Sequence, residues 1–334
     1  MKTNTKNIKV FTIIALMFLV LSSFKTNTVS PPKNSPVAIN GKLQVIGNQL
    51  SNKKGQPVVL RGTSFGWHCF RPRFYTDSAV NWLAADWKCS VVRIAMGVGP
   101  DNSYLQNPVF AKQCVTRVVD AAMRQGIYVL IDFHSHNLYT SEAKTFFTEM
   151  ATRYKDAPNI IYEIFNEPDK HATWIGVKKY SEEVISTIRA IDPDNIILVG
   201  SPHWNTDLDS VAADPIIGQT NIMYTMHFYA ATHKSGLRDK SDIALAAKIP
   251  IFVSECAGMQ SSGDGPIDSV EWTEYVNWME SKKISWIVWS VSDKNETCSM
   301  LTPQASSNGN WKDDSLKEWG KICKQTIQSL NTRK

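Results

Sequence analysis

Short hydrophobic runs recur along the chain, and most are followed by a stretch with the apolar spacing of an amphipathic helix. Eight runs have the composition of buried strands, and they cover residues 58–65, 91–96, 128–134, 160–167, 196–202, 222–230, 250–258 and 285–292. The helical spacing is clearest in residues 78–89, 110–126 and 272–283, and Gly126 stands where a helix would end. Strands that are apolar on both faces and alternate with helices predict an α/β fold with a parallel sheet.

Eight such units in about 250 residues predict a single-domain (β/α)8 TIM barrel. An open doubly wound sheet is the alternative, but no Gly-rich phosphate-binding pattern follows an early strand of this sequence. Ahead of the first strand, residues 43–57 have the pattern of two short strands joined by a turn. We expect them to form a β-hairpin that closes the barrel floor.

The first 30 residues have the character of an export signal. Lysines come first, and the apolar run 10–23 that follows is shorter than the roughly 20 residues of a membrane span. A cleavable signal peptide over residues 1–30 is therefore favoured over a membrane anchor. The expected localisation is secreted, either extracellular or periplasmic, and residues 31–38 are expected to be a linker.

The formal net charge of +5 belongs mostly to this N-terminal segment. Residues 1–30 contain four lysines and no acidic residue, so the remainder of the chain carries a net charge of +1. This nearly neutral remainder gives no electrostatic reason to expect binding to nucleic acid or to an anionic membrane.

Six cysteines remain after the signal segment, and none stands in a C-x-x-C pair, so a zinc site is not indicated. Export permits disulfides, but buried free thiols are an equally good interpretation. The sequence leaves this choice open for Cys69, Cys89, Cys114, Cys256, Cys298 and Cys323.

Polar and aromatic side chains stand near the ends of most of the predicted strands, where barrels of this type carry their functional groups. The residues are Arg93, Asp132, His134, Asn166, Glu167, His227, Tyr229, Glu255 and Trp289. Singly, each has a structural explanation, such as an ion pair for the arginine or core packing for the tryptophan. Together they bring functional groups from most of the strands to one rim, which indicates a binding or catalytic cleft.

Two of these residues, Glu167 and Glu255, are carboxylates on the fourth and seventh strands, which lie across a barrel from each other. Opposed carboxylates in a cleft rich in aromatic residues suit glycoside hydrolysis, in which one protonates the leaving oxygen and the other attacks the anomeric carbon or activates water. The chain contains eleven tryptophans, whose faces can stack on sugar rings. Pro168 ends strand pairing just after Asn166, whose amide can donate to a sugar 2-hydroxyl.

Glu163 shares a strand face with Glu167, because side chains of a strand alternate with a period of two. It is expected to point into the barrel one layer deeper. We interpret it as a structural group that pairs with a barrel cation, either Arg61 or Arg93.

Five motifs, IYEIFNEP, VSECAG, RGTSFGWH, DWKCSVVRIAMG and WSVSDKNETCSML, give the chain a resemblance to a known family. Over about residues 40–329 it resembles glycoside hydrolase family 5 of clan A, and within it the bacterial endo-β-1,4-glucanases of subfamily 2. The resemblance implies that residues 39–334 form a retaining catalytic domain that needs no cofactor and no metal. It also implies a monomer that binds β-1,4-glucans and cello-oligosaccharides, with no nucleic acid or membrane as partner.

The resemblance also assigns roles. It implies that Glu167 is the acid/base and Glu255 the nucleophile, with Arg93 orienting Glu255 and holding down its pKa. The implied substrate-binding residues are His68, Arg93, His134, Asn166, Trp204, His227, Tyr229, Trp289, Lys294 and Glu296. Trp289 is expected to be the platform of the −1 subsite. Trp204 is expected to stack under the aglycone sugar, whereas the last two residues of the set would bind distal glycone sugars.

The sequence departs from many relatives at two places. Gly97 stands where many carry tyrosine, and Cys256-Ala257-Gly258 stands where many have Trp-Gly or Phe-Gly. Both departures bear on the shape of the sugar subsites and leave the carboxylate pair intact. A β-mannanase or xyloglucanase of the same clan is the alternative, since fold does not fix substrate. A non-catalytic glycan-binding protein is less favoured, because both carboxylates are present.

Overall fold

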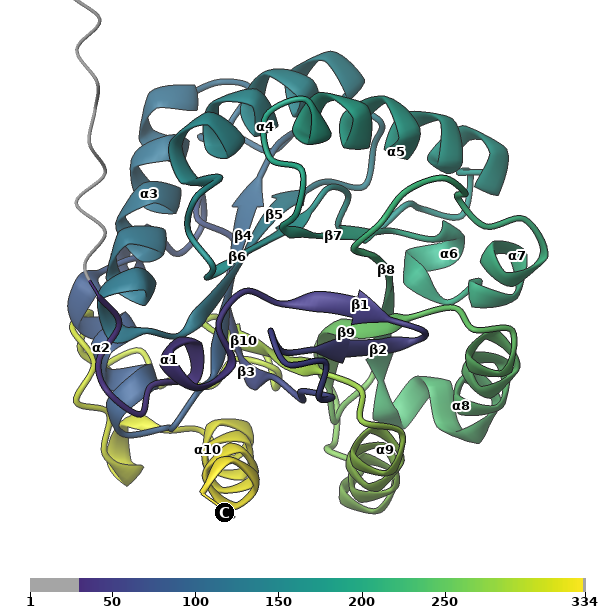
Figure 1. Cartoon of the computed structure of the whole chain (residues 1–334). Helices are drawn as coiled ribbons and strands as arrows, with labels where there is room; N and C mark the ends of the chain where they lie inside the picture. The colour runs from purple at the N-terminus through teal and green to yellow at the C-terminus, as the bar shows by residue number, and fades with distance from the viewer. Residues whose placement is uncertain (1–29, 333–334) are drawn as a thin grey trace, which may run out of the picture.

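The computed structural model describes residues 30–332, in which eight parallel strands close into a barrel (Figure 1). The strands are β3 (Arg61–Phe65), β4 (Val91–Gly97), β5 (Tyr128–His134), β6 (Ile160–Glu163), β7 (Ile196–Val199), β8 (Ile222–Tyr229), β9 (Ile251–Ala257) and β10 (Trp286–Val291). Each coincides with one of the eight predicted runs, although most are shorter. Strand β10 pairs with both β3 and β9, which closes the sheet, so the predicted TIM barrel is confirmed and the open sheet is excluded.

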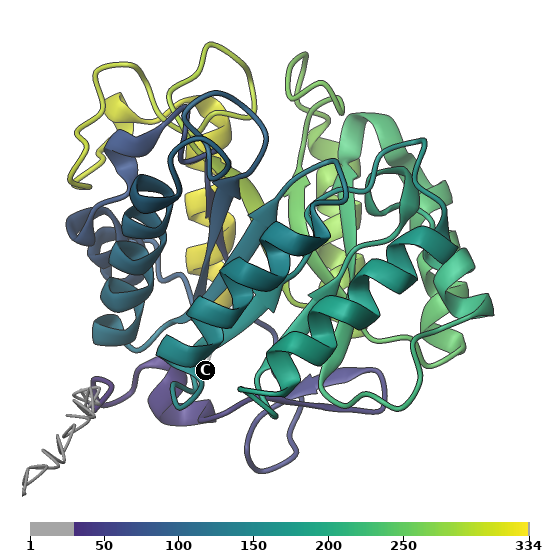
Figure 2. The ribbon, with the colours of Figure 1, turned by 90° about the horizontal axis from the view of Figure 1, so that it is seen from above.

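Helices surround the strands on the outside (Figure 2). They are α2 (Asp77–Ala85), α3 (Pro108–Gln125), α4 (Thr140–Tyr154), α5 (Trp174–Arg189), α6 (Pro202–Asn205), α7 (Leu208–Ala213), α8 (Ala230–Ala246), α9 (Ser269–Lys282) and α10 (Glu318–Asn331). Helix α3 ends at Gly126 as predicted. The residue has a φ of +67°, a left-handed conformation that favours glycine, and its N–H donates to the carbonyls of the last turn.

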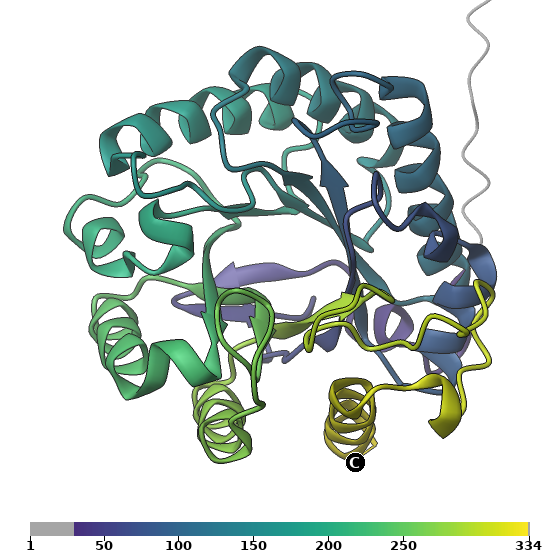
Figure 3. The ribbon, with the colours of Figure 1, turned by 180° about the vertical axis from the view of Figure 1, so that it is seen from behind.

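The predicted hairpin lies across one end of the barrel, as Figures 1 and 2 show from two directions. It consists of β1 (Gln44–Ile46) and β2 (Gln49–Ser51), which pair antiparallel. Leu50 is buried in a cluster with the apolar side chains that the barrel strands direct to this end. The hydroxyl of Tyr128 donates to the carbonyl of Gly41 at 2.6 Å. The hairpin therefore closes the floor and leaves the opposite end, seen in Figure 3, as the mouth of the barrel.

The segment just before the hairpin is more ordered than the sequence predicted. Helix α1 (Pro36–Asn40) begins inside the expected linker 31–38, and the hydroxyl of Ser35 caps it by accepting from a backbone N–H. Val37 is buried, and its N–H donates to the carbonyl of Gly126 at 2.9 Å. The linker boundary was therefore wrong, because this apolar side chain and its backbone dock on the barrel.

The predicted signal peptide lies almost entirely outside the described residues. Within residues 30–332, none of the helices combines the length and the apolar character that crossing a membrane requires.

All six cysteines lie within the described residues, and all are free thiols. Cys69 is partly exposed and the other five are buried. The interpretation as buried free thiols is the one that the structure supports.

Candidate active site

A cavity of about 1060 Å³ opens at the carboxyl ends of the strands, opposite the hairpin. Nine of the twelve predicted site residues line it, namely His134, Glu167, Trp204, His227, Tyr229, Glu255, Trp289, Lys294 and Glu296. Of the other three, Arg93 donates to Glu255, which lines the cavity, and Asn166 accepts from Arg93 and directly precedes Glu167. His68 lies outside the cavity.

The two glutamates approach each other closely in this cavity. Glu255 lies on β9 and is 4% exposed, whereas Glu167 lies in the segment that follows β6. One carboxylate oxygen of each residue lies within 4.8 Å of the other. Strand β6 ends at Glu163, earlier than predicted, but the residues beyond it still form backbone hydrogen bonds with the segment at the end of β5. The N–H of Glu167 donates to the carbonyl of Ser135 at 3.2 Å, which fixes the position of the carboxylate.

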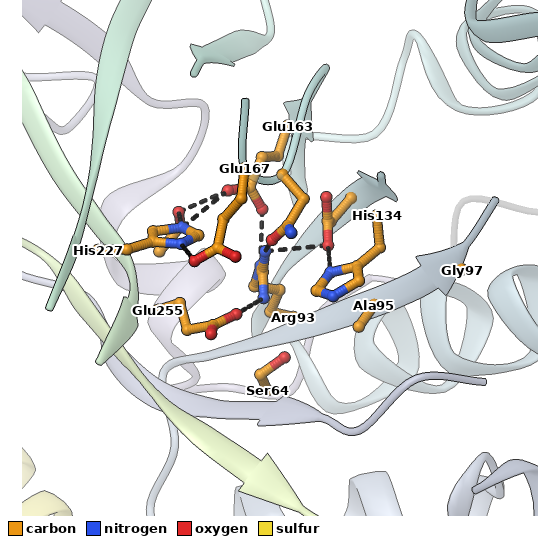
Figure 4. Close-up of polar contacts among 12 residues, drawn as sticks. Ser64, Arg93, Ala95, Gly97, His134, Glu163, Glu167, His227 and Glu255 are labelled. Carbon is orange, nitrogen blue, oxygen red and sulfur yellow. Dashed lines mark hydrogen bonds and ion pairs between the residues drawn. The ribbon is translucent and has the colours of Figure 1, made fainter. Parts of the chain in front are cut away.

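Arg93 is fully buried beneath the pair and binds several groups at once (Figure 4). Its guanidinium donates to Glu163 at 2.6 Å, to Glu255 at 2.9 Å and to the side-chain oxygen of Asn166 at 2.6 Å. It also forms an ion pair with Asp132 at 3.0 Å. One cation therefore faces three buried carboxylates, and its planar fork is suited to holding several oxygens in fixed directions.

Glu163 accordingly pairs with one of the two cations considered for it. Arg61, the other candidate, instead binds Glu280 on α9 at 2.5 Å. The oxygen of Asn166 is used by Arg93, but its amide nitrogen is buried without a hydrogen-bond partner in residues 30–332. Buried donors are normally satisfied, so this one is available to a ligand.

The nucleophile candidate Glu255 is held at both oxygens. The hydroxyl of Tyr229 donates to Oε1 at 2.8 Å, and Arg93 donates to Oε2. Burial and the neighbouring charge of Glu167 raise the pKa of Glu255, and they outweigh the opposing effects of His227, Arg93 and Tyr229. Arg93 does lower the pKa of Glu255, as expected, but the net shift of this pKa is upward.

His227 connects the second glutamate to the barrel interior. Its Nδ1 lies 2.8 Å from Oε1 of Glu167, and its Nε2 lies 2.9 Å from the hydroxyl of Ser254. Burial disfavours the charged ring, but the contacts with Glu163 and Glu167 outweigh it and raise the pKa of His227 to about 9. The ring is therefore charged at neutral pH.

Ser254 was missed by the sequence analysis because a regular strand would turn it away from Glu255. The register between β8 and β9 shifts before the pair His227–Glu255, as expected for a β-bulge. Phe252 packs in the barrel floor and Val253 packs in the outer core, after which both Ser254 and Glu255 point inward. An alternating pattern cannot reveal such a bulge.

His134 faces the cavity as predicted. Its Nδ1 lies 2.5 Å from Asp132, and its ring stacks on Trp289 with centroids 5.4 Å apart and planes 6° apart. Trp67, which the sequence analysis did not assign, also lines the cavity and packs edge-on against His134 at 4.2 Å. Burial, followed by the charge of Arg93, lowers the pKa of His134 well below its usual range, so the ring is neutral.

His68 has a structural position. It is fully buried, and its Nδ1 accepts a hydrogen bond from the N–H of Gly97 at 3.0 Å. A Cβ at Gly97 would lie 2.9 Å from both Trp67 and Cys69, so the glycine makes room for these two side chains. The predicted substrate contact of His68 is thus not supported by the structure.

His68 and His227 should shape the pH dependence of stability in opposite ways. Burial lowers the pKa of His68 to about 4, so its contribution is complete above pH 6.5 and is lost as pH falls toward 4. The pKa of His227 is raised to about 9, so its contribution is complete below 6.5 and is lost as pH rises toward 9. Each histidine changes the free energy of unfolding by about 3 kcal/mol at most.

We therefore expect the melting temperature to be highest near pH 6.5 and to fall on both sides, as measured by scanning calorimetry between pH 4 and 9. The variant His68→Gln should flatten the acid side and leave the alkaline side unchanged. An acid side as steep as in the wild type would contradict the assignment to His68.

The remaining predicted residues also line the cavity. Trp204 is 42% exposed, and its left-handed backbone is held by a hydrogen bond from its N–H to the carbonyl of Pro168 at 2.8 Å. Elsewhere on the lining, Lys294 pairs with Glu296, whose carboxylate also accepts from the thiol of Cys298 at 3.2 Å. Further lining residues that were not predicted as site residues are Phe70, Arg71, His136, His203 and His233. Phe70, Arg71 and His136 lie outside the regular helices and strands, whereas His203 belongs to α6 and His233 to the start of α8. Neither periodicity nor strand position identifies any of them.

Two opposed carboxylates at the carboxyl end of a closed (β/α)8 barrel, in a cavity lined with aromatic rings, are the arrangement of a glycoside hydrolase. The chain belongs to glycosyl hydrolase family 5, because the family model for cellulase (glycosyl hydrolase family 5) matches residues 51–295. An endoglucanase of Clostridium saccharobutylicum is 37% identical over 326 residues, which span 96% of this chain and 72% of that protein. Endoglucanase Z of Dickeya dadantii is 39% identical over 323 residues, with the same coverages of 96% and 72%.

Solved structures agree with this assignment. A structure from Cytophaga hutchinsonii is 42% identical and superposes with a TM-score of 0.87, covering 89% of this chain and 97% of that one. The catalytic domain of Thermobifida fusca endoglucanase Cel5A is 35% identical, with a TM-score of 0.84 and coverages of 88% and 99%.

Proposed function

We propose that this chain is a retaining endo-β-1,4-glucanase in which Glu255 is the nucleophile and Glu167 the acid/base. The observation that carries the proposal is the separation of the carboxylates, which bring one oxygen each within 4.8 Å. Retaining enzymes hold this pair about 5–5.5 Å apart, whereas inverting enzymes need about 6.5–9.5 Å to admit a water. The names of the endoglucanase relatives support the substrate class.

In the first step, an oxygen of Glu255 attacks the anomeric carbon while Glu167 gives a proton to the departing glycosidic oxygen. The bond between carbon and leaving oxygen breaks, and an ester between the sugar and Glu255 forms. In the second step, Glu167 takes a proton from a water, which attacks the same carbon and releases Glu255. Two inversions give net retention. Arg93 and Tyr229 hold Glu255 in position and stabilise its negative charge before the attack and after its release.

The proposed sugar-binding residues follow from their places in the cavity. Trp289 and His134 present stacked rings beside the carboxylates, and the unpartnered amide of Asn166 can donate to the sugar 2-hydroxyl. Trp204 offers an exposed indole for the aglycone sugar. A variant of the Thermobifida fusca domain binds cellotetraose, which supports cello-oligosaccharides as ligands of this cavity.

We also propose that the mature protein is secreted and acts as a monomer. The lysine-led apolar segment in residues 1–30 supports export. An enzyme for polymeric glucans must meet them outside the cell, because a long polysaccharide does not cross the membrane.

The activity is tested by assaying the purified chain on carboxymethylcellulose, mannan, glucomannan and xyloglucan, with cellopentaose followed by proton NMR. We expect a rapid fall in the viscosity of carboxymethylcellulose, and the β-anomer as the first product from cellopentaose. Cleavage of mannan or xyloglucan without cleavage of carboxymethylcellulose would contradict the substrate, and a first product in the α-form would contradict retention.

A further inference from the structure

Ser254 is fully buried between two groups of the site, although the mechanism above gives it no role. Its hydroxyl lies 2.5 Å from Oε1 of Glu163 and 2.9 Å from Nε2 of His227. The nearest oxygen of Glu163 lies 3.7 Å from Nε2 of His227, which is too far for a direct hydrogen bond. Ser254 therefore links a histidine and a carboxylate that form no direct hydrogen bond with each other.

The hydrogens of this bridge can be assigned from what each group is able to donate. Burial disfavours the charged form of Glu163, but Arg93 and His227 together outweigh it and lower the pKa of this carboxyl, so it is ionised and only accepts. The single hydrogen of the Ser254 hydroxyl must then point to Glu163. Its oxygen can therefore only accept from His227, and Nε2 of that ring must carry a hydrogen.

The other ring nitrogen faces the acid/base candidate. Nδ1 of His227 lies 2.8 Å from Oε1 of Glu167, a distance that requires one hydrogen between the two atoms. Because the Nε2 hydrogen is fixed by the bridge, this second hydrogen is the only one that the ring can gain or lose.

We propose that Ser254 is a positioning residue that locks His227 in the form protonated at Nε2, so that the acid proton of Glu167 is held between Oε1 of Glu167 and Nδ1 of His227. This inference deepens the proposed function and rests on it. In the first step, the proton passes from Nδ1 to Oε1 and from the carboxyl to the leaving oxygen, which leaves a neutral imidazole and a carboxylate. In the second step, Glu167 takes a proton from the attacking water and returns it to Nδ1, which restores the starting state.

The charges around His227 are consistent with this role. Glu167 faces the ring from the segment after β6, Glu163 from β6 itself and Glu255 from β9. Arg93 on β4 is the neighbouring cation, and it is neutralised by its contacts with Glu163, Glu255 and Asp132. The ring therefore lies on the acidic side of the network, and its charged form is favoured as long as the bridge to Glu163 is intact.

The test uses the full chain and the variants Ser254→Ala, which removes the bridge, and Ser254→Thr, which retains the hydroxyl. Ser241→Ala is the matched control, because Ser241 is equally buried and donates to a helix carbonyl at 2.7 Å, away from the site. The first measurement is the pH profile of kcat/KM on cellopentaose. The second is the long-range proton–nitrogen NMR spectrum of protein labelled with ¹⁵N-histidine, in which His227 is assigned by its loss in His227→Gln.

In the wild type, we expect Nε2 of His227 to stay protonated throughout, while Nδ1 alone titrates. In Ser254→Ala, a form protonated at Nδ1 should appear at high pH, and the alkaline limb of kcat/KM should move down by about one pH unit. Ser254→Thr and Ser241→Ala should behave as the wild type. A Ser254→Ala variant with unchanged tautomer and a uniformly lower rate at every pH would overturn the proposal. The NMR result does not depend on activity, so a failure of the glucanase assay in the wild type would be recognised separately.

Discussion

Replacing Glu255 by glutamine is expected to lower kcat on carboxymethylcellulose by at least about 10⁴-fold. Glutamine has the size of glutamate and can still accept from Tyr229, so the cavity keeps its shape. Its neutral amide, however, cannot form the ester with the anomeric carbon. Because the sugar contacts remain, the dissociation constant of cellotetraose should be within about threefold of the wild-type value. The wild-type value is extrapolated from initial rates, because the wild type cleaves this sugar. The measurements are initial rates of reducing-end release and isothermal titration calorimetry.

Glu280→Gln is the matched control for this variant, because Glu280 lies on α9 and pairs with Arg61 outside the cavity. It should keep the wild-type rate. If Glu255→Gln retains a rate near that of the wild type, the nucleophile assignment is wrong. If it also loses cellotetraose binding, the carboxylate contributes to holding the ground state, and the rate loss cannot be ascribed to chemistry alone.

The fold could be predicted because each strand of a parallel barrel is buried on both faces and therefore appears as a continuous apolar run. The ends of the strands do not follow from the apolar runs alone. Ile164 and Phe165 continue the apolar run of β6, but residues 164–167 leave the regular ladder, since the chain turns there to direct Glu167 into the cavity. Similarly, residues 36–38 were assigned to the linker because they continue a Pro-, Ser- and Asn-containing stretch, yet α1 docks on the end of α3 through Val37.

The candidate site could be predicted where a polar side chain stands near a strand end, as for Glu167 and Glu255, which the structure brings together in the cavity. It could not be predicted where position depends on tertiary geometry. A bulge in β9 turns Ser254 inward, and close packing around Gly97 buries His68 beside the cavity. Loop residues such as His136 reach the cavity through the course of the backbone alone. Periodicity carries no information on any of these three effects.

The contacts of Arg93 are the structural element that most of the site depends on. Among the described residues, the guanidinium is the one cation that contacts all three of Asp132, Glu163 and Glu255, and all four side chains are almost completely buried. We expect Arg93→Met to lower the free energy of unfolding at pH 7 by about 3–5 kcal/mol, because it leaves buried carboxylates without a counter-charge. Urea unfolding followed by tryptophan fluorescence measures this loss, and kcat should fall in parallel because Glu255 loses the donor at Oε2.

The pH dependence of this loss distinguishes missing charge compensation from missing packing. Without Arg93, the pKa values of Glu163 and Glu255 in the folded state should rise, so each takes up a proton that removes its unpaired charge as pH falls. Burial already raises the pKa of Asp132 well above its usual range while Arg93 is present. A raised folded-state pKa favours folding at low pH, and the deficit of Arg93→Met should therefore shrink between pH 7 and pH 5. Arg61→Met, which removes a partly exposed pair with Glu280, should cost no more than about 1–2 kcal/mol and show no such recovery. A deficit of Arg93→Met that is equally large at both pH values would mean that the methylene packing of the side chain, rather than its charge, holds the network together.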